Sequence, residues 1–83
     1  MDLKNIEDLE DTHIDDFYKM IGLNVKKARE TKGLTQLQLS QALGFKSVGL
    51  VSQSELYINK QHFNLKHLYL IAYILNCDMK ELL

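Results

Sequence analysis

The stretch TQLQLSQALGFKSVGLVSQSE, residues 35–55, carries the signals of two short helices joined by a sharp turn. Thr35 lies three residues before Gln38, the spacing of a capping box at a helix start. The residues that follow at helical spacing are apolar: Leu37, Leu39, Ala42 and Leu43. Gly44 permits the left-handed backbone that ends a helix. Because a second, polar helix begins soon afterwards, we expect two helices set at a steep angle.

The composition indicates one small helical domain. The chain has 83 residues, of which 46% are hydrophobic, with no proline and four glycines, so strand and turn signals are scarce. Cys77 has no second cysteine to pair with, which is typical of a reducing compartment. No apolar run approaches the roughly 18 residues of a membrane span, and the N-terminus is acidic. These features favour a cytoplasmic protein.

We expect an all-α fold with five helices, at about residues 16–32, 35–43, 47–57, 65–75 and 78–83. A polar loop is expected at 58–63. Residues 1–15 then form an acidic extension, and 16–83 form a compact domain. The positions expected to face the core are Phe17, Ile21, Val25 and Ala28, then Leu50 or Val51, Ser54 and Ile58, then Leu65, Leu68, Ile71, Ala72 and Leu75, and finally Met79, Leu82 and Leu83.

The net charge of −1 conceals a strong asymmetry along the chain. The first sixteen residues hold seven carboxylates and one lysine, whereas residues 17–83 hold nine lysines and arginines against four carboxylates. The body is therefore basic and the extension acidic. Three interpretations of the extension are open: a solvated tail, a site for a protein partner, or a competitor that lies against the basic face and weakens nucleic-acid binding.

Four segments follow one another in the basic body: IGLNVKKARETKGLTQ at 21–36, LSQALG at 39–44, VSQSE at 51–55 and LYLIAYILNCDMKELL at 68–83. In this order they resemble the lambda repressor/Cro-like (XRE-type) helix-turn-helix regulators, over roughly residues 19–83. The resemblance implies a compact five-helix DNA-binding domain in which the helix at about 47–57 reads the major groove. Two departures stand out. The turn from Gly44 to Val51 is one residue longer than usual, and Tyr57 replaces the family's common glycine.

The expected DNA-binding residues surround that reading helix. They are Gln36, Lys46, Ser47, Val48, Ser52, Gln53, Asn59, Lys60 and Gln61. Gln53 is the first choice for a base, since glutamine bonds bidentately to adenine, and Val48 suits a thymine methyl group. The two lysines should meet phosphates. Because the helix has no arginine, we expect A/T-leaning readout and a modest salt dependence.

Gln36 and the pair formed by Arg29 and Glu55 have alternative roles. The resemblance implies that Gln36 gives its amide to a phosphate, and the alternative is an exposed residue at a helix start. It also implies that Arg29 and Glu55 pair to fix the angle of the reading helix, a structural role. The functional alternative places Arg29 on a phosphate.

The helix at 65–75 is apolar almost all round, which indicates a partner. We expect a homodimer through four of its residues: Tyr69, Leu70, Tyr73 and Ile74. In the alternative, the extension covers this face with Leu3, Ile6 and Leu9.

Catalytic and metal-binding patterns are not recognised in this chain. The histidines are scattered, and Cys77 fits a small buried residue better than a nucleophile. We therefore expect a non-enzyme without metal or cofactor that binds double-stranded DNA sequence-specifically and represses transcription. A protein-interaction module of helix-turn-helix fold is the alternative, antitoxin-like or an adaptor, which binds its partner through the fourth helix and the acidic extension.

Overall fold

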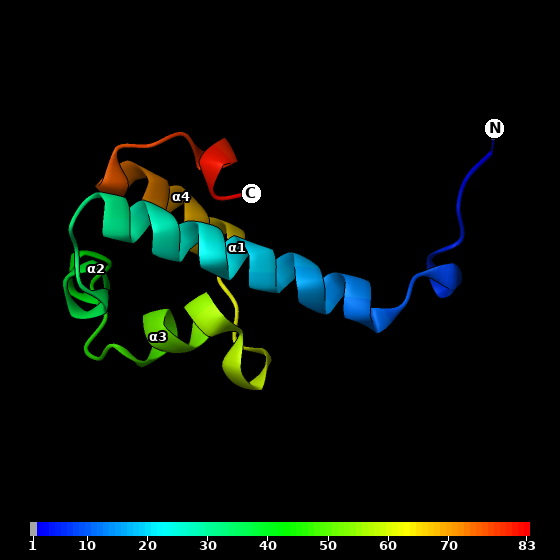
Figure 1. Cartoon of the computed structure of the whole chain (residues 1–83), viewed down its shortest axis with the longest axis horizontal. Helices are drawn as coiled ribbons and strands as arrows, with labels where there is room; N and C mark the ends of the chain where they lie inside the picture. The colour runs from blue at the N-terminus through cyan, green and yellow to red at the C-terminus, as the bar shows by residue number, and fades with distance from the viewer. Residues whose placement is uncertain (1) are drawn as a thin grey trace.

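The protein is all-helical, which confirms the expected fold class. The computed structural model describes residues 2–83, and these contain four α-helices and no β-strand (Figure 1). The α-helices are α1 (Asp11–Thr31), α2 (Gln36–Ala42), α3 (Gly49–Leu56) and α4 (Leu65–Leu75). Three 3-10 turns accompany them: η1 (Ile6–Asp8), η2 (Ile58–Lys60) and η3 (Met79–Glu81). In the described part of the chain, none of the helices has the length and apolarity to cross a membrane.

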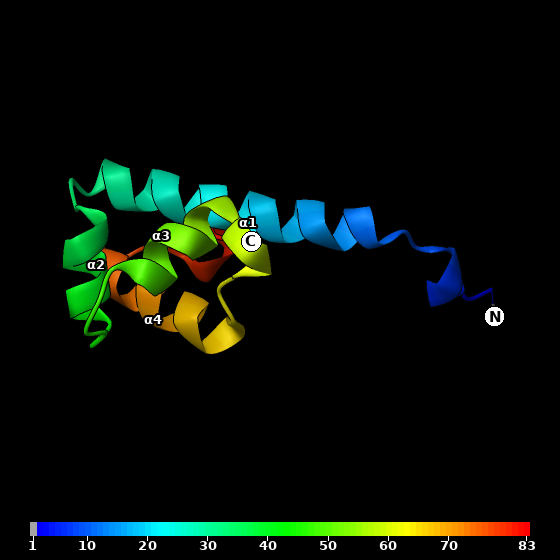
Figure 2. The same ribbon diagram turned by 90° about the horizontal axis from the view of Figure 1, so that it is seen from below.

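The longest helix, α1, organises the molecule and also projects from it. It packs on α3 and α4, while its first turns extend beyond the body and carry η1 at their far end (Figures 1 and 2). The principal extents of 45 × 27 × 19 Å reflect this projection. Residues 2–10 consequently lie away from α4 and do not cover it, so the expectation that Leu3, Ile6 and Leu9 cover that helix is wrong.

The core is formed where α1, α3 and α4 meet. Its buried hydrophobic residues are Ile21, Val25, Leu39, Val51, Phe63, Leu68, Ile71, Ala72, Leu75 and Leu82. Most of the expected core positions are among them. Four are wrong because they lie on outer faces or beyond the end of the packed region: Phe17, Ile58, Leu65 and Leu83. Phe63, assigned to a polar loop, is instead 2% exposed and anchors the segment before α4.

The predicted signals at both ends of α2 are confirmed. The Thr35 hydroxyl accepts a hydrogen bond from the Gln38 N–H at 3.0 Å, and the Gln38 side chain accepts from the Thr35 N–H at 2.8 Å. At the other end of α2, Gly44 adopts φ +82°, a conformation that only glycine takes without steric cost. The capping box and the glycine together limit α2 to two turns.

Three predicted boundaries are corrected by the structure. The first helix begins at Asp11 rather than about residue 16, and early carboxylates such as Asp11 favour the positive N-terminal end of a helix. The last predicted helix is the single 3-10 turn η3, because the Asp78 side chain accepts from the Lys80 N–H and the chain turns after three residues. The reading helix spans Gly49–Leu56, shorter than predicted at both ends.

The start of α4 contains a histidine, His67, that takes part in the capping box of this helix. Asn64 caps this helix by accepting from the His67 N–H at 2.8 Å, and His67 Nδ1 accepts from the Asn64 N–H at 3.1 Å. The imidazole also lies edge-on to Phe45 and Phe63. Burial disfavours the charged imidazolium and lowers the pKa of His67, with smaller effects from Lys66 and His62.

His67 is therefore expected to weaken the fold in mild acid. Its pKa in the folded state lies below the unfolded value, about 6.5, so the unfolded chain takes up the proton first as the pH falls. The stabilisation is complete above that value and is lost below it. Urea unfolding at pH 7.5 and pH 5.5 should show a smaller decrease for His67→Gln than for wild type, because glutamine keeps the capping box without titrating. Equal decreases in both proteins would contradict this role.

Candidate nucleic-acid interface

The candidate interface is the outer face of α3 with the segments on either side of it. α2 is set steeply against α3, and α2 and α4 flank it when the molecule is viewed from below (Figure 2). No other helix of residues 2–83 crosses in front of α3 in that view. Its inner face supplies Val51, Ser54 and Glu55 to the interior, all fully buried. One face of α3 is thus fixed in the core while the other is open.

A buried network of charges and amides holds α3 in place. Arg29 Nε donates to Glu55 Oε2 at 2.8 Å, and Arg29 Nη2 donates to Glu55 Oε1 at 3.1 Å. The remaining guanidinium nitrogen donates to the Leu34 carbonyl at 2.7 Å. The hydrogen bond to Glu55 raises the pKa of Arg29, against the effect of burial. This two-pronged contact connects α1, the turn after it and α3, as the structural interpretation of the pair expects.

Gln36 belongs to the same network. Its Nε2 donates to Glu55 Oε1 at 2.9 Å, so its side chain faces α3 and the carboxylate rather than solvent alone. The resemblance implies that this amide contacts a phosphate. In the structure the amide donates to Glu55 instead, and the residue is half-buried. Gln36 therefore lies at the junction of the buried network and the surface.

The other candidate DNA-binding residues lie on the open side of α3 or close to its ends. Six of them are exposed: Lys46, Ser47, Val48, Gln53, Asn59 and Lys60. Ser52 and Gln61 are half-buried, and the Ser52 hydroxyl donates to the Gly49 carbonyl at 3.2 Å. Among residues 2–83 no side chain caps the first turn of α3. The two exposed lysines lie in the segments before and after α3. The leading N–H groups of this helix have no side-chain cap.

The segment after α3 holds a strained backbone. Tyr57, Asn59 and Lys60 have φ values of 56°, 53° and 60°, in the left-handed region that favours glycine. Each such residue costs on the order of 1 kcal/mol or more and persists only where its surroundings impose it. Strain of this kind clusters at functional sites, and here it sets the direction of the Asn59 and Lys60 side chains.

The contacts of Tyr57 stabilise a bulky residue at a position where the family that the chain resembles commonly has glycine. Its hydroxyl donates to Asp15 Oδ1 at 2.7 Å, which raises the pKa of Tyr57 to about 12. Its ring stacks on Tyr18, and Tyr18 stacks in turn on His62 with ring centroids 4.0 Å apart. These contacts join the end of α3 to the N-terminal half of α1, across the predicted boundary at residue 15. Sequence reasoning missed the cluster because its members come from two segments roughly forty residues apart in the chain.

The predicted dimer face on α4 is only partly available. Tyr69 and Tyr73 are exposed, whereas Leu70 is half-buried. Ile74 packs against the protein's own core. Like Leu70, it is half-buried, since the helical spacing places it beside Ile71 and Leu75. Two tyrosines remain as the exposed part of that face.

The rest of the chain offers little chemistry. Within residues 2–83 there is no group of three or more histidine, cysteine or carboxylate side chains that could hold a metal ion. Cys77 is half-buried beside the core, and burial raises the pKa of its thiol, which disfavours the reactive thiolate.

The fold and the site define a small all-helical protein in which one short helix, α3, is held by a buried ion pair and has an open outer side. No protein-family model matches this chain, and neither a curated protein nor a solved structure matches it.

Proposed function

We propose that this protein binds double-stranded DNA sequence-specifically as a compact lambda repressor-like helix-turn-helix regulator, and that it represses transcription by occluding a promoter. One observation carries the proposal: α3 is fixed from behind by Glu55, while Gln53 on the helix and the residues just before it, Lys46, Ser47 and Val48, are exposed. A helix in the major groove reads bases with its N-terminal part while the helix before it crosses the backbone. α2 and α3 have the lengths and the steep crossing that this geometry needs.

The exposed side chains suit particular parts of DNA. Gln53 projects from the middle of α3, where its amide can accept from and donate to one adenine edge. Val48, at the helix start, suits a thymine methyl group. Lys46 and Lys60 stand at opposite ends of α3 and match phosphates on either side of a groove. Phosphate neutralisation by few lysines implies a shallow salt dependence.

The proposed roles of Gln53 and Lys60 are separable by two substitutions. Gln53→Ala should weaken binding to the upstream DNA of its own gene by about 1–3 kcal/mol and leave affinity for random DNA unchanged. Lys60→Gly should weaken binding to both DNAs and reduce the salt slope by about 1. It should also stabilise the fold, because glycine relieves the left-handed backbone at this position. Fluorescence anisotropy at two salt concentrations, with urea unfolding, measures all of these.

The matched control for this experiment is Lys80→Ala. Lys80 is an exposed lysine in η3, on the far side of the body from α3 (Figure 1), so its loss should not change DNA affinity. Specific binding that weakens with salt supports the regulator. If no DNA binds even at low salt, the protein is instead a protein-interaction module with the same fold.

We further propose that the regulator acts as a homodimer, since two-fold symmetry would let two α3 helices read half-sites about one helical turn apart. The uncovered surfaces that could form such a contact include the tyrosine pair on α4 and an apolar groove beside the N-terminal part of α1.

A further inference from the structure

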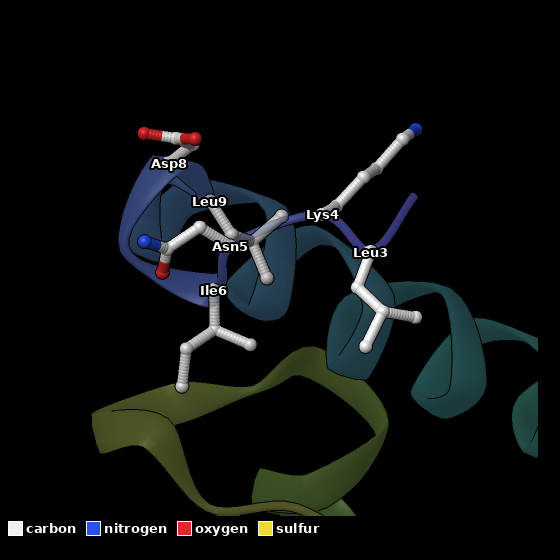
Figure 3. Close-up of a pocket in the computed structure, with 6 residues that line it drawn as sticks. All are labelled: Leu3, Lys4, Asn5, Ile6, Asp8 and Leu9. Carbon is white, nitrogen blue, oxygen red and sulfur yellow. The ribbon is translucent and has the colours of Figure 1, made fainter. Parts of the chain in front are cut away.

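The N-terminal segment, residues 3–9, carries apolar side chains that its own chain leaves uncovered. These are Leu3, 81% exposed, Ile6, 85% exposed, and Leu9, 49% exposed. Figure 3 shows Leu3 and Ile6 extending to one side of the segment, and Lys4 and Asp8 to the opposite side. The hollow that this view shows is lined by residues of the segment alone. The segment is thus amphipathic and has an apolar side without a partner.

An apolar groove of about 540 Å³ lies elsewhere on the same chain. Its walls come from the middle of α1, residues 62–64, the start of α4 and the final residue. Phe17, Leu65 and Leu83 line it and are all exposed, Leu65 to 70%. A small body that leaves three large apolar side chains around one groove presents a surface suited to an apolar partner.

We propose that two copies of this protein exchange their N-terminal segments, so that residues 3–9 of each copy lie in the groove of the other. Charge supports this occupant. The segment and the residues that flank it, 2–11, hold five carboxylates and one lysine, whereas the charged side chain that lines the groove is Lys66. Opposite charges around an apolar contact favour this pairing and fix its orientation.

The direction of α1 favours a second copy over the segment's own groove. α1 is continuous from Asp11, and it holds the segment at the far end of the projection, away from the body (Figure 1). Glu10 before it has extended backbone, φ −75° and ψ 144°, rather than a reverse turn. Within one chain, the segment and the groove therefore stand apart.

The two-fold symmetry of the exchange increases the contact area between the two copies. In a two-fold pair each copy gives one segment and receives one, so every contact occurs twice. The two projecting α1 halves also approach each other, which brings Ile14, another exposed apolar residue, into the contact. Because every contact occurs twice, the exchange doubles the buried area, and stable interfaces usually bury about 800 Å² per partner.

The test is sedimentation equilibrium of the full chain at tens of micromolar, without DNA, so that its result is independent of the proposed function. Wild type should show a mass that rises with concentration toward the dimer. Ile6→Lys and Leu65→Lys should each weaken the dimer at least about tenfold, because each places a lysine in the apolar contact. Both residues are exposed, so circular dichroism should show folded variants.

A mixture of the two variants makes the test specific for exchange. Each variant alone has two defective contacts, whereas a mixed pair has one intact segment in one intact groove, so mixing should restore part of the association. Tyr73→Lys, on the alternative α4 face and 82% exposed, is the control and should leave the dimer intact. A monomeric wild type, a dimer that survives both groove variants, or a dimer lost in Tyr73→Lys would each overturn the proposal.

Discussion

Gly22→Ala is expected to lower the free energy of unfolding by about 3 kcal/mol or more. A Cβ at this position would stand 2.4 Å from the Ser54 carbonyl oxygen and 2.7 Å from that of Glu55. Both atoms belong to the backbone of α3, so no side chain can rotate away, and α1 must move off α3. For a domain of this size the loss corresponds to a decrease in melting temperature of about 12 °C or more. Thermal unfolding followed by circular dichroism measures it.

Gly49→Ala provides the matched control for Gly22. A Cβ at Gly49 meets only the Ser47 hydroxyl at 3.7 Å, an ordinary contact. Since alanine favours helix over glycine, this variant should be as stable as wild type or slightly more stable. If Gly22→Ala melted within a few degrees of Gly49→Ala, the close approach of α1 and α3 would not be a determinant of the fold.

The parts of the fold that the sequence predicts are those set by local chemistry. The Thr35 capping box and the glycine after α2 depend on residues within four positions of one another, and both are present in the structure. The pairing of Arg29 with Glu55 is of another kind. This pairing was predicted only from the resemblance, which covers both residues. Their spacing in the sequence does not indicate that they lie close together.

The features that the sequence did not predict depend on tertiary geometry. Phe63 follows a run of polar residues, and only the path of the chain back to the core buries it. Leu68 and Leu65 share one apolar helix, and their opposite burial follows from which side of α4 meets the core. Gly22 had a usable signal, since a glycine inside a helical pattern often marks close packing. The groove could not be predicted because it is formed by three elements that are separate in the sequence. The lack of a partner for the N-terminal segment likewise follows only from the positions of these elements in space.

The buried network behind α3 leads to the second large effect. Glu55→Ala should lower the free energy of unfolding by about 3–5 kcal/mol, because it leaves the Arg29 guanidinium buried without its counter-charge. The carboxylate is 0% exposed and accepts from both Arg29 and Gln36. Three N–H donors, two on Arg29 and one on Gln36, therefore lose their acceptor in one step. DNA affinity should fall as well, since α3 loses the contact that fixes it. Urea unfolding and anisotropy titration measure the two losses.

The double variant Arg29→Met with Glu55→Leu separates a structural role of the pair from a direct contact of Arg29 with DNA. Apolar side chains of similar volume often replace a buried ion pair at little cost, so the double variant should be more stable than Glu55→Ala alone. Gln36 and Leu34 are half-buried, and water can satisfy the polar groups that Glu55 and Arg29 release. If the pair acts by holding α3, DNA affinity should recover together with stability. A stable double variant that still binds DNA as weakly as Glu55→Ala would show that the guanidinium itself contacts a phosphate, and the structural interpretation would then be wrong.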